Sequence, residues 1–254
     1  MTEERSSANG MLGKGLRLLV ALGDHPDGAG VSRLAKDAEV PVSTAHRLLA
    51  GMIPLGFVSF DRERRRYSLG LRTFELGQRV ASARRLSDVA LPTMRRITTA
   101  TGETSLLAVL SGDDVLYLER AEGKHLAQIW GAPGVRGSPH FTSLGKCLLA
   151  FLPGEEREQI LSRLSLEALT PHTITDADHL RKVLTRVRER GYATNDEEHE
   201  EGVRAVGVPV IDRRGRPAAA LSIATLTFRY SMQELEGFVP LLREAAREIE
   251  VQLP

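Results

Sequence analysis

The sequence predicts an α+β protein in which a small helical N-terminal module precedes a larger module of antiparallel strands covered by helices. A chain of 254 residues is long enough for two ordinary domains. After Gly102 the apolar residues change from a mainly helical spacing to short runs with a period of two. Residues 1–85 carry 14 Lys and Arg against 9 Asp and Glu, whereas the remainder carries 20 against 24. We therefore expect a basic module that meets a polyanion, joined to a mildly acidic module with another task.

The only cysteine, Cys147, excludes an internal disulfide framework and fits a reducing compartment. No charged start with an apolar segment opens the sequence, and no run of about eighteen apolar residues follows. These features predict a cytoplasmic protein that does not enter a membrane.

Two helices are expected after a polar, frayed start over residues 1–9. The first is predicted by an apolar stripe that should face a core: Leu12, Leu16, Leu19 and Val20. It ends at the turn-forming stretch GDHPDGAG. A short helix over residues 32–38 follows, with three side chains turned inward: Leu34, Ala35 and Ala38.

A third helix should begin at Pro41, after the brief connection EVP. Its apolar stripe has helical spacing: Ala45, Leu48, Leu49 and Met52. Its other face is small, polar or basic: Ser43, Thr44, His46, Arg47, Ala50 and Gly51. Two helices joined by a short turn, the second with a polar outer face, form the helix-turn-helix pattern.

The polar face of the third helix suits the major groove of B-DNA, which is about 12 Å wide and admits one helix. Ser43, Thr44 and the helix N-terminus can bind phosphate oxygens, and His46 lies on the same face. Arg47 can bind a guanine through two hydrogen bonds or contact a phosphate. Such a face is often simply solvated.

The stretch GFVSFDRERRRYSLG predicts a hairpin, with strands over residues 57–60 and 67–69. This hairpin would be a wing with four arginines near its tip: Arg62, Arg64, Arg65 and Arg66. Arg64 and Arg65 would contribute salt-dependent affinity for the DNA backbone. The order of short helix, turn, second helix and basic wing favours double-stranded DNA over a solvated surface. A winged helix-turn-helix over residues 1–70 is therefore predicted.

A linker helix is predicted over residues 71–85, and a separate helix around Met94 and Ile97 should end at Gly102. The second domain would then cover residues 86–254. Three strands are expected first: TSLLAVLSG, DVLYLERAEG and LAQIWG. Helices follow over residues 144–151, 155–164 and 178–190. Two further strands, VRAVGVPVID and PAAALSIATL, precede a closing helix over residues 232–251, and Pro209 implies a strand edge or a bulge.

The start of the helix over residues 144–151 has two possible roles. Thr142 or Ser143 can simply cap the helix. Alternatively, the free N–H groups at Ser143, Leu144 and Gly145, with the positive end of the helix dipole, form a site for a carboxylate or phosphate.

Two other features could carry chemistry. The run DEEHEE over residues 196–201 could bind a metal with His140 or His172, but consecutive residues point in different directions, which favours a solvated or intersubunit loop. Cys147 near a helix N-terminus could be a nucleophile with His140 as its base, yet its setting GKCLLAF indicates a core side chain. A metal- or thiol-dependent enzyme is therefore the alternative, and no catalytic, metal or cofactor site is predicted.

Several motifs resemble one family throughout the chain. STAHRLL, YSLG and LRTFELG are similar to the winged helix and linker of the IclR family of bacterial transcriptional regulators. HFTSLGKCLLAFLP and RGYATNDEEHEEGVRAVGVPVIDRRGRPAAALSIA resemble the characteristic stretches of that family's effector-binding domain. The match extends over residues 12–251 with the motifs in family order. The resemblance implies a GAF/profilin-like second domain.

The resemblance also implies an effector pocket. Carried over by position, it would be formed by six residues: Ser143, Leu144, Asn195, Val203, Ala205 and Ser222. Leu106, Tyr117 and Trp130 could complete an apolar wall. Relatives commonly have Asp where this chain has Asn195, and a small residue where it has Cys147, so the ligand recognised can differ.

Together these features predict a sequence-specific transcriptional regulator, with repression favoured over activation. Its partners would be double-stranded operator DNA and a small organic or aromatic acid, with a carboxylate as the expected recognised group. A homodimer or a dimer of dimers is expected, because each recognition helix binds one half-site of an inverted repeat.

Overall fold

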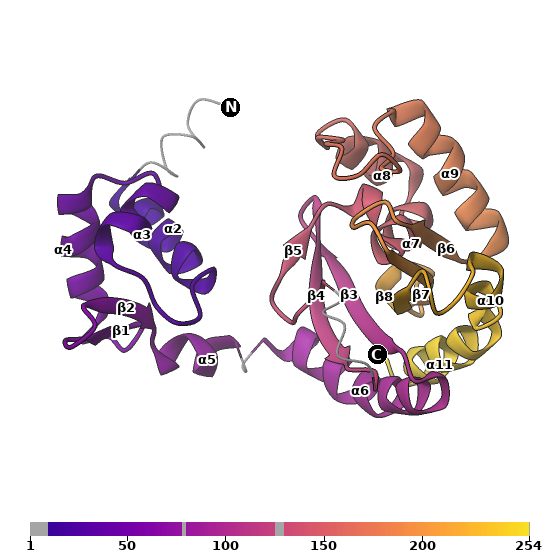
Figure 1. The fold of residues 1–254 in the computed structure, drawn as a ribbon, viewed down its shortest axis with the longest axis horizontal. Coiled ribbons are helices and arrows are strands. Elements are labelled where there is room, and N and C mark those ends of the chain that lie inside the picture. The colour runs from indigo at the N-terminus through magenta and orange to yellow at the C-terminus, as the bar shows by residue number, and fades with distance from the viewer. Residues whose placement is uncertain (1–9, 78–79, 125–129, 254) are drawn as a thin grey trace. The chain divides into compact units, whose positions relative to one another are not determined.

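A computed structural model of the chain describes residues 10–77, 80–124 and 130–253. The chain forms two compact units, Met1–Arg84 and Arg85–Pro254 (Figure 1). Each unit has its own buried core. In the described part of the chain, no helix has both the length and the apolar character needed to cross a membrane.

The smaller unit packs three helices against a hairpin. Its helices are α2 (Met11–Gly23), α3 (Val31–Asp37) and α4 (Val42–Met52). The hairpin consists of β1 (Val58–Asp61) and β2 (Arg66–Leu69), paired antiparallel from Val58↔Leu69 to Asp61↔Arg66. A bridge between Ala29 and Tyr67 ties the segment before α3 to this hairpin. The order helix, helix, turn, helix and wing is the one expected from the sequence.

The predicted inward stripe of α2 is wrong for three of its four residues, whereas Leu19 does pack against the core. Leu12, Leu16 and Val20 are 77, 54 and 70% exposed, whereas Leu18 and Leu22 of the same helix are buried. The helix has apolar side chains at helical spacing on two faces, so periodicity alone could not choose between them. Packing decides: a Cβ on Gly15 would lie 2.8 Å from Met52 Cε, so this side of α2 lies against α4.

The predicted single linker helix is divided in the structure. α5 ends at Gly77 (Leu71–Gly77), Val80 N–H donates to Gly77 O, and α6 begins at Ala81. Residues 78–79 lie outside the described part. α6 (Ala81–Thr101) then continues without the break that was expected before Met94. Its buried residues recur at helical spacing and keep one face on a core: Leu86, Ala90, Met94 and Ile97.

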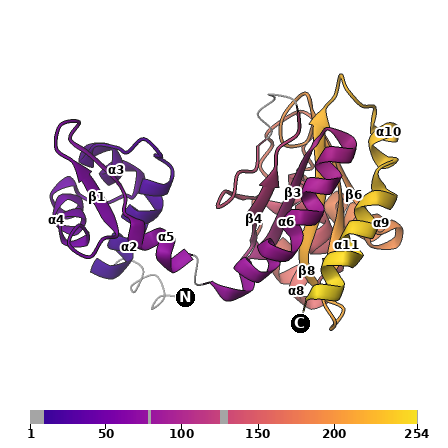
Figure 2. The same ribbon diagram turned by 90° about the horizontal axis from the view of Figure 1, so that it is seen from below.

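The larger unit contains a six-stranded, wholly antiparallel sheet in the order β5-β4-β3-β8-β7-β6 (Figures 1 and 2). Its strands are β3 (Thr104–Ser111), β4 (Asp114–Ala121), β5 (Arg136–Gly137), β6 (Ala193–Asp196), β7 (Val203–Ile211) and β8 (Pro217–Leu226). β6 pairs with residues 204–207 of β7, so Pro209 lies beyond that pairing, at a local strand edge. This confirms the expectation drawn from that proline.

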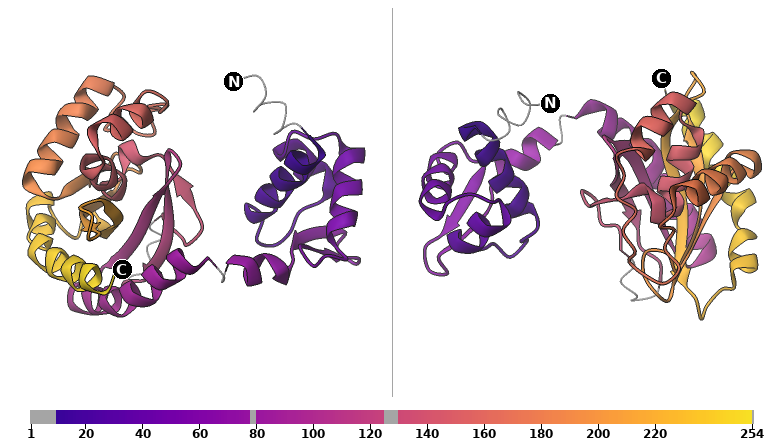
Figure 3. Two further views of the ribbon diagram at one scale, coloured as in Figure 1. Left: turned by 180° about the vertical axis from the view of Figure 1, so that it is seen from behind. Right: turned by 90° about the horizontal axis from the view of Figure 1, so that it is seen from above.

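Helices cover both faces of this sheet (Figure 3). One layer has α6 and α11 (Val239–Gln252), and the other has α7 (Ser143–Phe151) and α9 (Ala177–Arg190). The side chains of β8 face both helix layers. Leu221 and Ile223 belong to the core under α6 and α11, whereas Ala220 and Ala224 belong to the core under α7. This alternation follows from the two-residue period of a strand.

Several element boundaries differ from those expected. The closing helix is divided into α10 (Met232–Glu236) and α11, because Gly237 and Phe238 intervene and Pro240 lies in the first turn of α11. α8 (Gly154–Leu161) ends earlier than predicted. The short strands β5 and β6, and a 3₁₀ turn over Pro139–Phe141, were not predicted. The strand expected at LAQIWG falls largely on residues 125–129, outside the described part.

Candidate nucleic-acid interface and ligand cavity

The outer face of α4 is built as the sequence predicts. Ala45 and Leu49 are buried, and Leu48 and Met52 pack against the same core. Thr44 is half-buried, and the other residues of the polar face are exposed: Ser43, His46, Arg47, Ala50 and Gly51. The helix therefore offers a surface of small and basic side chains with its N-terminus free of an acidic residue. Such a surface can enter a major groove and approach phosphates.

The wing turn holds its arginines outward. Asp61 Oδ1 accepts hydrogen bonds from Glu63 N–H at 2.9 Å and Arg64 N–H at 3.0 Å, which closes the turn. Arg65 occupies the left-handed region at φ 52°. The side chains of Arg64 and Arg65 are exposed at the tip. Positive charge is thereby concentrated at the tip of the hairpin.

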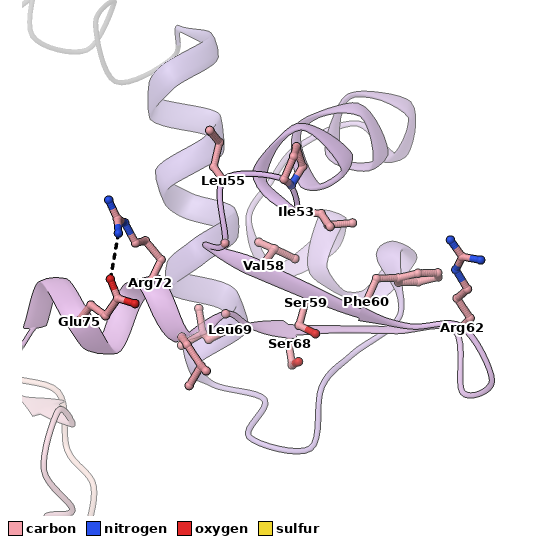
Figure 4. Close-up of a pocket in the computed structure, with 14 residues that line it drawn as sticks. Ile53, Leu55, Val58, Ser59, Phe60, Arg62, Ser68, Leu69, Arg72 and Glu75 are labelled. Atoms are coloured by element: carbon pink, nitrogen blue, oxygen red, sulfur yellow. Dashed lines mark hydrogen bonds and ion pairs between the residues drawn. The ribbon is translucent and has the colours of Figure 1, made fainter.

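A groove of about 870 Å³ lies between the end of α4, the hairpin and α5 (Figure 4). Its lining mixes polar side chains with apolar ones, the latter including Leu55, Val58, Phe60 and Leu69. Arg72 and Glu75 of α5 form an ion pair of 2.9 Å at one side of it. The groove is wide open, unlike an enclosed ligand site.

The larger unit has a small, partly open cavity at the N-terminus of α7, with about 30 Å³ of free space. Thr142 caps the helix by accepting the Gly145 N–H at 2.9 Å. A Cβ on Gly145 would lie 2.3 Å from Pro139 Cα, so only glycine permits this approach to the preceding turn. The N–H groups of Ser143 and Leu144 are among those that helix geometry leaves without an intrahelical acceptor, and both residues line the cavity.

A second polar group in this cavity comes from the sheet. Ser222 Oγ on β8 is buried and has no hydrogen-bond partner within the described residues. A buried hydroxyl without a partner carries a free-energy cost that a ligand would relieve. Asn195 also lines the cavity, and its Oδ1 accepts the Glu198 N–H at 2.9 Å, which leaves the amide NH₂ as its donor.

Aromatic rings form the opposite wall. The rings of Tyr117 and Trp130 meet edge to face at 5.1 Å, and His199 lies 4.4 Å from Trp130 and 4.9 Å from Phe141 between ring centroids. Burial lowers the pKa of His199, so its neutral form is favoured. Burial also raises the pKa of Tyr117, whose hydroxyl is hydrogen-bonded to Thr142. The cavity thus combines an apolar aromatic wall with hydrogen-bond donors at one end.

Two family models match the chain. The IclR helix-turn-helix domain matches residues 11–62, and the bacterial transcriptional regulator IclR C-terminal model matches residues 78–251. The chain belongs to the IclR family. It is a DNA-binding transcriptional regulator with an effector-binding C-terminal domain, and its relatives are regulators rather than enzymes.

Relatives of this IclR-family protein match it along most of their length. The HTH-type transcriptional regulator KdgR of Escherichia coli is 36% identical over 236 residues, which cover 93% of this chain and 89% of KdgR. The transcriptional repressor IclR of the same species is 31% identical over 240 residues, covering 94% and 88% of the two chains. A solved structure of an IclR homolog from Microbacterium hydrocarbonoxydans, complexed with 4-hydroxybenzoate, has a TM-score of 0.85 at 32% identity, covering 96% of this chain and 99% of that one.

All six residues predicted for the effector pocket line one cavity in this IclR-family chain: Ser143, Leu144, Asn195, Val203, Ala205 and Ser222. Leu106, Tyr117 and Trp130 join them, as the sequence allowed. Contact of these residues with a ligand stays a prediction, as does contact of the six DNA-binding candidates with DNA. Sequence reasoning missed Thr142, His199, Glu200 and Ala224 as lining residues. For His199, the neighbouring acids of DEEHEE suggested a solvated loop, and nothing in that run indicated a ring packed inward.

The expected character of the DEEHEE loop needs a correction at Glu198. Its side chain is buried and lies 2.5 Å from Nζ of Lys146, which is buried on α7. Burial lowers the pKa of Lys146 and raises that of Glu198, and their mutual attraction opposes both effects. The described residues contain no group of three or more His, Cys, Asp or Glu placed to hold a metal ion. The loop is therefore partly solvated and partly fixed to α7.

Proposed function

We propose that this IclR-family protein is an operator-binding repressor whose DNA affinity changes when a small organic or aromatic acid binds in the cavity at α7. The observation that carries the ligand class is the convergence of Ser143, the α7 N-terminus and the unpartnered Ser222 Oγ on one small space. Donors of this kind favour an anionic oxygen, and the helix dipole adds to the attraction. The aromatic wall provides apolar area for the remainder of the ligand.

The DNA contacts proposed for α4 and the wing follow from their chemistry. Ser43, Thr44 and His46 would contact the backbone or base edges near the N-terminal half of α4, and Arg47 would bind a base. Arg64 and Arg65 would contact phosphates. The relative named as a transcriptional repressor supports repression as the direction of control.

A homodimer is proposed from the exposed apolar face of α2. Leu12, Leu16 and Val20 form an exposed stripe at helical spacing on one side of α2, with no described neighbour to cover it. Exposed apolar patches of this kind commonly mark interaction sites. A second copy of the chain is the natural occupant, because two recognition helices would then bind an inverted repeat.

The proposal is tested by selecting the operator from random duplexes and then measuring its electrophoretic shift with a panel of organic and aromatic acids. A salt-sensitive, sequence-specific shift that one acid relieves is expected. A shift that no acid alters would contradict effector control, and equal binding to every duplex would contradict operator recognition. Replacing Ser143 with Leu should remove the response to the acid while leaving DNA affinity unchanged, since Ser143 lies in the other unit from α4.

A further inference from the structure

The cavity at α7 is too small for the aromatic acids that its walls would suit. Its free space of about 30 Å³ holds about one water molecule, whereas a cavity of roughly 150 Å³ is the size known to admit a benzene ring. An aromatic effector therefore has to displace a side chain. The question is which of the surrounding rings can leave.

The slot that a ligand ring would enter is bounded by fixed walls. Trp130 meets Tyr117 edge to face, and a Cβ on Gly137 would lie 2.4 Å from Trp130 Cη2, so the indole lies directly on that glycine. Phe141 is buried at the turn before α7. Moving either ring would open a void in the surrounding packing, which is costly.

The imidazole of His199 fills the space between Trp130 and Phe141, and it is the least firmly packed of these three rings. Its described interactions are the two ring contacts of 4.4 and 4.9 Å and an electrostatic attraction to Glu200, and the imidazole forms no hydrogen bond with a described residue. The ring is half-buried, and burial favours its neutral, stackable form. A side chain held mainly by ring packing can be replaced by another ring.

The backbone beside His199 is anchored, so displacement needs only a rotation of its side chain. Glu198 is tied through its carboxylate to Lys146 at 2.5 Å and through its N–H to Asn195 Oδ1 at 2.9 Å. Its carbonyl oxygen accepts from Thr173 Oγ1 at 2.6 Å. Glu200, on the other side of His199, is exposed but also lines the cavity, so a ligand carboxylate would be directed away from it, toward Ser222 and α7.

We propose that His199 is the specificity-determining residue of the effector site: its imidazole occupies an aromatic slot between Trp130 and Phe141, and an aromatic carboxylic acid takes its place. The ring of the acid enters the slot and its carboxylate meets the N-terminus of α7. When a small aliphatic acid binds, the imidazole of His199 stays in the slot. This inference rests on the proposed function for the location of the site. It narrows the ligand class to aromatic carboxylic acids and names the residue that selects them.

The test is calorimetric titration of the full-length protein with benzoate, 4-hydroxybenzoate and propionate. His199→Ala should bind the two benzoates about tenfold more tightly, the order of magnitude expected when one or two ring contacts no longer compete, and propionate equally. His199→Phe should bind the benzoates about tenfold more weakly, because its ring is more apolar and fills the slot better. His172→Ala, at an exposed histidine of the same unit, is the matched control and should leave all three affinities unchanged.

Any other outcome of the titrations either supports or overturns the proposal. Benzoate binding by His199→Ala but not by the unaltered protein would support the proposal. It would be overturned by weaker or unchanged benzoate binding in His199→Ala, by an equal gain for propionate, or by no benzoate binding in either protein. Circular dichroism and an unaltered DNA shift establish that the variants fold. If benzoates bind as expected but operator affinity does not respond, effector control fails while the role of His199 stands.

Discussion

Arg47 is the side chain on which base recognition is expected to depend. It is exposed on the outer face of α4, where among the described residues its Nη2 makes a weak contact with Met11 Sδ at 3.8 Å. Arg47→Ala should cost roughly 1 to 3 kcal/mol in operator binding and relax the preference at one base pair. Competition shifts with operator and random duplexes measure both effects. An equal loss on random DNA would show that Arg47 contacts a phosphate instead.

Lys146 and Glu198 form a buried ion pair in which each charge stabilises the other. Lys146→Ala should destabilise the second unit by roughly 3 to 5 kcal/mol, because it leaves a buried carboxylate without its partner. The double variant Lys146→Met with Glu198→Leu should recover most of that loss, since neither charge is then buried. Urea unfolding followed by Trp130 fluorescence measures the effect in this unit. Lys182→Ala, at an exposed position on α9, is the control, and a double variant as unstable as the single one would refute the argument.

The wing should contribute affinity without sequence preference. Arg64→Gln with Arg65→Asn keeps the turn, because Asn tolerates the left-handed conformation at position 65 and Asp61 still closes it. The loss of two phosphate contacts should weaken binding to all duplexes and flatten the slope of log affinity against log salt by about 2. Titrations at several salt concentrations give the slope. An unchanged slope would mean that the wing does not meet the backbone.

The start of α7 depends on the absence of a side chain at one position. Gly145→Ala should destabilise the second unit by roughly 1 to 3 kcal/mol, because the added Cβ would lie 2.3 Å from Pro139 Cα and 2.4 Å from Pro139 O. Gly154→Ala, at the start of α8, is the matched control: an added Cβ there meets nothing within 4 Å and should be neutral or slightly stabilising. Thermal unfolding compares the two. Equal melting temperatures would contradict the packing described for α7.

What could be predicted from the sequence differs among these elements. α4 has one apolar face, so its buried and exposed residues followed from spacing alone. α2 has leucines on two faces, and its orientation depends on contact with Met52, which no local pattern contains. The effector cavity was located through family resemblance, whereas His199 and the Lys146–Glu198 pair arise from tertiary contacts between distant segments. Local chemistry therefore predicted most of the longer helices and strands, and packing determined which faces meet.

The apolar stripe of α2 leads to a prediction about the assembly. Leu16→Glu with Val20→Glu should produce a species of lower mass and reduce operator affinity at least tenfold, because a monomer can occupy only one half-site. Sedimentation equilibrium measures the mass. Phe228→Ser alters an equally exposed apolar side chain in the other unit and serves as the control. An unchanged mass in the α2 variant would assign the stripe to some other contact.

The reactivity of the buried Cys147 thiol reports on the opening of the second unit. Its Sγ donates to Gly207 O at 3.2 Å, and burial raises the pKa of the thiol to about 12. Reaction with an alkylating reagent requires both access and the thiolate, so it can occur only while α7 is separated from the sheet. A ligand that binds the closed form would slow this reaction by a factor equal to one plus the ratio of the ligand concentration to the ligand's Kd. The thiol is thus shielded from oxidants in the folded protein, and its rate of alkylation measures how readily α7 separates from the sheet.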